Sequence, residues 1–174
     1  MNEIFPPINA VSLETARPGS IVRIPRSGGP ILALKADKSP NDTGHSFVVL
    51  NSKVANRPSV YFAKNWRNEN SCMAYKENLQ FELSVHDADL NIGGSELWDV
   101  PGVIISTGDQ FFIRAFAFEP FSGDVHHVNI QTGALFAGQL PSDICTFPSW
   151  QIWLRDSKER SFCIFKFKIG ERAP

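Results

Sequence analysis

Alternation of apolar and polar residues in steps of two is the clearest pattern in this chain. In residues 78–85 (NLQFELSV), four apolar residues alternate with three polar ones: Leu79, Phe81, Leu83 and Val85 against Gln80, Glu82 and Ser84. This repeat places the apolar side chains on one face of a strand. Similar short apolar runs, separated by Gly and Pro, predict strands at residues 20–24, 30–35, 46–50, 59–63, 102–106, 110–119, 125–131, 150–155 and 162–169.

Helical patterns are scarce. No segment of roughly 12 residues or more shows the 3.6-residue repeat of an amphipathic helix. Short helical turns are expected near residues 12–16, 65–74 and 141–145. The sequence therefore predicts an all-β fold, with about ten short strands in a sandwich or a curled barrel.

The segment GSIVRIPRSGGPILAL, residues 19–34, contains a tight reversal at Ser-Gly-Gly-Pro between two apolar runs. It resembles the opening hairpin of the YodC-like family, in which a G-D-x-V-x-L strand runs into Ser-Gly-Gly-Pro and a second apolar strand. The resemblance requires a one-residue insertion. It implies an SH3-like curled hairpin near the N-terminus, and it implies no activity because that family has no well-defined one.

The length of 174 residues predicts a single β domain over residues 1–174. A chain of this size buries roughly 70% of its unfolded surface, so its core needs neither a metal nor a disulfide. The alternative is a small barrel-like subdomain at residues 1–65 followed by a sandwich subdomain at residues 76–174. The boundary would then fall in the polar segment between them.

The cysteines and the apolar runs indicate a cellular location. The 3 cysteines are widely spaced and odd in number, which favours a reducing compartment over a disulfide framework. The first residues lack the pattern of a signal peptide, and the apolar runs are shorter than the ~20 residues of a membrane helix. We therefore expect a soluble, intracellular, cytoplasmic protein without membrane association.

Charges are sorted along the chain. Between Glu77 and Asp143 there are ten carboxylates and one base, Arg114, whereas both flanking segments carry more bases than acids. The formal net charge of −1 therefore conceals an acidic segment with a net charge of −9. Such a segment is expected to pair with the basic flanks, to bind a cation or to meet a basic partner.

One candidate metal site follows the strand at residues 78–85. Oxygen-bearing side chains at alternating positions of a tight loop, Asp87, Asp89 and Asn91, are the type of ligand that Ca²⁺ prefers. Ile92 stands where an EF-hand loop needs glycine, so that motif is excluded. The alternative interpretation, which we favour, is a polar β-turn in which Asp and Asn bond to their own backbone.

A second candidate metal site involves histidines. His126 and His127 are adjacent on a predicted strand and must point to opposite faces, so only one of them can reach a given metal. His126, His86 and one aspartate would form the two-histidine, one-carboxylate set of a transition-metal site. The alternative is that these histidines are structural.

The predicted strands at residues 150–155 and 162–169 suggest a binding face. Alternation separates Trp153 and Arg155 from the apolar residues of the first strand, and Lys166 and Lys168 from those of the second. If the strands pair in the matching register, these four side chains share one face. Trp and Arg are favoured at protein interfaces. The alternative is a second core layer under the N-terminal segment.

These features predict a non-catalytic β-sheet module that binds another macromolecule, most plausibly a protein. Contact is expected through an acidic surface, which would suit a basic partner, or through the Trp153 face, or both. No nucleophile elbow or phosphate loop is present, and a pI near 6.4 argues against direct nucleic-acid binding. The alternative is a divalent-metal-dependent barrel or sandwich, either a hydrolase or oxygenase-like enzyme or a calcium-assisted ligand binder. Exposed strand edges leave the oligomeric state open.

Overall fold

The computed structural model describes residues 8–38, 43–52, 60–66, 71–75, 79–92, 97, 100–117, 124–136, 138, 143–155 and 161–170. The structure is nearly all β, as predicted, and its strands form two sheets. No helix among these residues is long and apolar enough to cross a membrane. A short 3₁₀ turn, η1, covers Val85–Asp87.

The larger sheet has 11 strands and the smaller has 3. The larger one contains β1 (Ile8–Ser12), β2 (Ile21–Ile24), β3 (Ile31–Ala36), β4 (His45–Val49), β5 (Tyr61–Trp66), β6 (Ser71–Tyr75), β8 (Asp89–Ile92), β9 (Ile104–Thr107), β10 (Gln110–Ala117), β11 (Val125–Asn129) and β12 (Asp143–Phe147). Their order is β1-β6-β2-β3-β4-β5-β10-β9-β12-β8, with β11 also paired to β10. The smaller sheet has the order β14-β13-β7, from β7 (Leu79–Leu83), β13 (Ser149–Arg155) and β14 (Ser161–Lys168).

All of the strands predicted from the sequence form, with shifted ends. The helical turns expected near residues 65–74 and 141–145 are wrong where the structure describes them, because β5 extends to Trp66 and because β6 and β12 occupy the rest. Strand β6 pairs with both β1 and β2, and β12 pairs with both β8 and β9. Neighbours distant in the sequence therefore supply the hydrogen bonds that local pattern does not predict.

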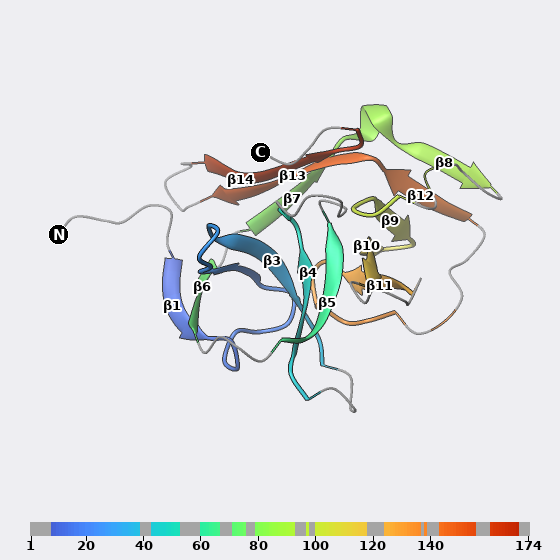
Figure 1. Ribbon diagram of the computed structural model, residues 1–174. Helices are drawn as coiled ribbons and strands as arrows, with labels where there is room; N and C mark the ends of the chain where they lie inside the picture. The colour runs from blue at the N-terminus through green and yellow to red at the C-terminus, as the bar shows by residue number, and fades with distance from the viewer. Residues whose placement is uncertain are drawn as a thin grey trace.

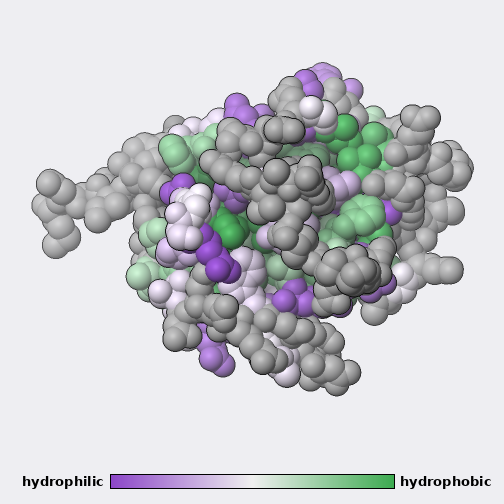
Figure 2. Space-filling model, viewed as in Figure 1, coloured by the Kyte–Doolittle hydropathy of each residue, from purple (hydrophilic) through white to green (hydrophobic). Residues whose placement is uncertain are grey.

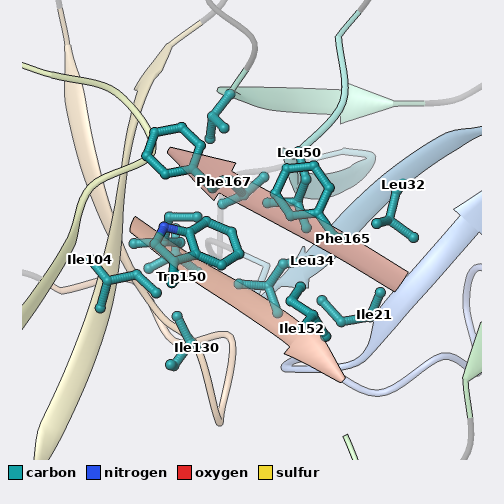
Figure 3. Close-up of a cluster of buried hydrophobic side chains, with 14 of the residues drawn as sticks. Ile21, Leu32, Leu34, Leu50, Ile104, Ile130, Trp150, Ile152, Phe165 and Phe167 are labelled. Atoms are coloured by element: carbon teal, nitrogen blue, oxygen red, sulfur yellow. The ribbon is translucent and has the colours of Figure 1, made fainter. Parts of the chain in front are cut away.

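The smaller sheet covers one side of the larger sheet. In Figure 1, β14, β13 and β7 run across the top of β3, β4 and β5. Alternate residues of β13 are buried, namely Trp150, Ile152 and Leu154. All three pack in one cluster with residues of the larger sheet such as Ile21 and Leu34. Figure 3 shows Trp150 and Ile152 in this cluster. The cluster thus joins both halves of the chain, and the division into one or two domains stays a prediction.

One contact fixes the two sheets at their centre. The indole Nε1–H of Trp150 donates to the Gly102 carbonyl at 2.8 Å, and the Trp150 ring stacks on Phe167 with ring centroids 5.4 Å apart. Gly102 lies in the turn before β9 and is tied to the larger sheet, because its N–H donates to the carbonyl of Arg114 in β10 at 2.7 Å. Gly102 has φ +91°, and a Cβ there would lie 2.4 Å from the Phe167 ring. Only glycine fits this position without displacement.

The backbone of the turn after β11 also lies close to the backbone of the N-terminal half of the chain. The Gly19 N–H donates to the Lys35 carbonyl at 2.8 Å, and the Asp37 N–H donates to the Gly133 carbonyl at 2.7 Å. A Cβ on Gly19 would lie 2.1 Å from the Gln131 carbonyl oxygen. The backbones of the two segments therefore lie too close for a side chain between them.

The contact at Gly102 predicts a large loss of stability in Gly102→Ala. The added methyl group must displace the Phe167 ring and adopt a left-handed conformation, so we expect a loss of about 3 kcal/mol or more in the free energy of unfolding. Gly108→Ala is the matched control, because Gly108 has φ +60° but no atom within 4 Å of the added Cβ. Its expected loss is about 1 kcal/mol. Urea unfolding measures both, and equal losses would contradict the steric argument.

Candidate functional site

The outer face of the smaller sheet carries the predicted binding residues. In the observed register Gln151 lies opposite both Lys166 and Glu82, and Ser149 lies opposite Lys168. We call this surface the outer face, and it consists of Gln80, Glu82, Ser149, Gln151, Trp153, Arg155, Ser161, Cys163, Lys166 and Lys168. Trp153, Arg155, Lys166 and Lys168 therefore do share one face.

These four residues are spread along that face. Strand β13 separates Arg155 from Ser149, the residue opposite Lys168, by roughly 20 Å at ~3.3 Å per residue. The β13–β14 register shifts between Ile152 and Trp153, so that Trp153 lies opposite Cys163 of β14. On its other side Trp153 lies opposite Gln80 of β7. Trp153 thus occupies the middle of the sheet, with bases toward both ends.

Trp153 is half-buried, whereas the three bases are exposed. Its indole nitrogen is shielded from solvent and has no hydrogen-bond partner among the described residues. Beside it, the Cys163 thiol has two acceptors within reach for its one hydrogen, the Gln151 side-chain oxygen at 3.7 Å and the Phe165 carbonyl at 3.4 Å. Glu82 is the only carboxylate among the residues of the outer face. The face is therefore polar and positively charged around one aromatic ring.

The first candidate metal segment differs from the expected loop. The polar turn predicted there is wrong for residues 89–92, which form β8 and pair with β12, so that Asp89 lies opposite Thr146 and Asn91 opposite Ile144. Asp87 belongs to η1. The side chains of Asp87, Asp89 and Asn91 lie outside the described part of the structure. Pairing with β12, which sequence pattern did not predict, explains why a strand forms here.

The histidines do not assemble into a metal centre in the described structure. His126 lies opposite Ala115 and its ring centroid is 4.3 Å from that of Phe62, whereas the neighbouring His127 lies opposite Arg114 on the other face. His86 is exposed in η1. Among the described residues, no three His, Cys, Asp or Glu side chains form a group that could hold a metal ion.

Burial controls the protonation of His127. It lowers the pKa of His127 from its ordinary 6.5 to about 4, and the charges of Arg114 and His126 act in the same direction. Arg114 itself is buried, with an exposed fraction of 3%. Its guanidinium lies 5.7 Å from the centroid of the Phe116 ring. His127 is therefore neutral in the folded protein at physiological pH.

The described carboxylates of the acidic segment do not gather on one surface. Glu82, Asp109, Asp124 and Asp143 are exposed. Asp109 and Asp124 flank opposite ends of the β10–β11 pair, and Glu82 lies on the other sheet. Glu82, Asp109 and Asp124 therefore lie on separate parts of the described structure, whereas the β9–β12 register places Asp143 near the turn that carries Asp109.

A cavity of about 450 Å³ lies beside the β2–β3 hairpin. Arg23 and Arg26 line it together with aromatic and aliphatic residues from β5, β6 and β14. Sequence analysis missed this site, although the basic residues before Ser-Gly-Gly-Pro were a local signal. The remaining walls come from strands that only the tertiary structure brings to the hairpin.

Comparison with known proteins adds no further assignment: no protein-family model, no curated protein and no solved structure matches this chain.

The lowered pKa of His127 predicts a specific pH dependence. Between pH 6.5 and 4 the unfolded chain binds a proton at His127 that the folded protein does not, so this residue makes stability fall as the pH falls. Because solvent partly screens this ring, we expect the free energy of unfolding to fall by about 1–2 kcal/mol through His127 over this range. His127→Gln should therefore lose less stability than the wild type over this range, as measured by urea unfolding at several pH values.

His86→Gln is the control for this measurement, because His86 is exposed. Its unfolding free energy should follow the wild-type pH dependence. An unchanged slope in His127→Gln would show that His127 titrates normally in the folded protein.

Proposed function

We propose that this chain is a non-catalytic interaction module that binds an acidic segment of another protein through the outer face of the smaller sheet. The observation that carries the proposal is a half-buried Trp153 in the middle of a polar face with Arg155, Lys166 and Lys168 exposed around it. Tryptophan is among the residues most enriched at the centres of protein interfaces. The non-catalytic part rests on the sequence, which lacks motifs of nucleophilic catalysis.

The sheet supports this face as a rigid platform. Strand β13 is paired on both sides, by β7 and by β14, so its backbone is held in the sheet. The opposite side of β13 carries Trp150 and Ile152, which are buried in the core. Side chains on the outer face are therefore held at fixed spacing, which lowers the entropic cost of binding.

Charge selects the partner. The outer face presents three bases and one carboxylate, Glu82, so an acidic partner is electrostatically complementary. A protein is favoured over a nucleic acid because Glu82 lies among the bases and because Gln80 and Gln151 offer uncharged donors and acceptors. A basic partner, the other possibility suggested by the sequence, has less support because Glu82, Asp109 and Asp124 lie on separate parts of the described structure.

Selection from a random peptide display library tests the proposal. The enriched peptides should be rich in Asp and Glu and should contain an apolar residue. Their affinity should fall about tenfold or more in Trp153→Ala and in Lys166→Glu, because each change removes a central contact or reverses a charge. Fluorescence anisotropy with a labelled selected peptide measures the affinity.

Lys38→Glu combined with Lys64→Glu is the matched control, because both lysines are exposed and lie outside the outer face. It makes a larger change of charge than Lys166→Glu and should leave the affinity within about twofold. Peptides without acidic enrichment, or equal binding by Lys166→Glu, would refute the proposal. Tighter binding of a single-stranded oligonucleotide at the same face would replace the protein partner with a nucleic acid.

A further inference from the structure

The cavity beside the β2–β3 hairpin has the size of a small-molecule site. Its volume of about 450 Å³ falls within the range of ~300–1,000 Å³ that is typical of ligand pockets. It lies where the hairpin meets the end of β6, the residues after β4, and β14 of the smaller sheet. On the face shown in Figure 2, a hydrophobic area over the position of β3 borders strongly hydrophilic residues.

The apolar part of the cavity belongs to the main core. Leu32, Tyr75 and Phe165 line it, and all three are buried members of the core cluster between the sheets. Ile164 joins them from β14, where the register shift opposite Ile152 and Trp153 leaves it as the extra residue. These walls are fixed by core packing and offer a preformed surface to an apolar group.

The polar part of the cavity is cationic. Arg23 lies opposite Leu32 in the β2–β3 register, so it projects from the same face of the sheet as that core residue. Arg26 comes from the turn, and its guanidinium lies 4.3 Å from the centroid of the Trp66 ring. This contact limits the orientations that Arg26 can adopt. None of the described residues that line the cavity is a carboxylate.

The rim of the cavity is held in place by Asn51. Its side-chain oxygen accepts a hydrogen bond from the Leu32 N–H at 2.6 Å, and its side-chain nitrogen donates to the Pro30 carbonyl at 3.4 Å. These bonds tie the hairpin to the residues that follow β4. A Cβ built on Gly28, which also lines the cavity, would have no atom within 4 Å.

We propose that this cavity binds a small organic anion, with its apolar body against Leu32 and Phe165 and its carboxylate or phosphate at Arg23. Guanidinium groups bind both kinds of anion through paired hydrogen bonds, and the described residues of the lining include no carboxylate that would repel an anion. This site is separate from the outer face, and the inference does not depend on the proposed function.

Isothermal titration with four probes tests this inference: naphthoate, naphthyl phosphate, the cationic naphthylmethylamine, and inorganic phosphate alone. We expect saturable binding of at least one naphthyl anion. The naphthyl cation and inorganic phosphate should each bind at least about tenfold more weakly than the naphthyl anion. The cation lacks the negative charge, and inorganic phosphate lacks the apolar body. Tighter binding of naphthoate would identify a carboxylate ligand, and tighter binding of naphthyl phosphate a phosphate monoester.

Arg23→Gln is the decisive variant, because Arg23 is exposed and its replacement should leave folding intact. It should weaken binding of the naphthyl anion about tenfold, and Arg17→Gln, an exposed arginine outside the cavity, should not change it. Equal binding of the naphthyl anion and cation, no saturable binding of either anion, or an unchanged affinity in Arg23→Gln would overturn the proposal. Lys166→Gln should leave the affinity unchanged, which separates this site from the outer face.

Discussion

The hydrogen bond from Trp150 to the Gly102 carbonyl is the contact on which the packing of the two sheets depends. A buried indole N–H without a partner is costly, so this bond specifies where the smaller sheet sits on the larger one. The Phe167 ring occupies the space beside Gly102 that a side chain would fill. Donor, carbonyl and ring come from three separated parts of the chain, and together they set the spacing of the sandwich.

That arrangement gives the two faces of β13 different roles. The inner face is committed to the core through Trp150, Ile152 and Leu154. The outer face is left with polar and charged residues around Trp153. The same placement of β14 brings Ile164 and Phe165 to the β2–β3 hairpin, where they complete the cavity. The proposed binding face and the cavity thus both follow from how the smaller sheet packs.

Several features of the site were predictable because they need only local periodicity. The alternation in β13 and β14 separated Trp153, Arg155, Lys166 and Lys168 from the core side chains, and the observed register places these four on one face. Local pattern also placed His126 and His127 on opposite faces of one strand. It failed at residues 89–92, because β8 exists through its pairing with β12, itself a strand that local pattern did not indicate.

The sequence by itself determined the all-β class, the strands with strong alternation, and the composition of the face around Trp153. These follow from the two-residue repeat, which any strand imposes on its own side chains. Only the tertiary structure decided the strand order, the additional strands β1, β6, β8 and β12, and the union of Arg23, Tyr75 and Phe165 around one cavity. Those features depend on hydrogen bonds and packing between residues far apart in the chain, which no local pattern encodes.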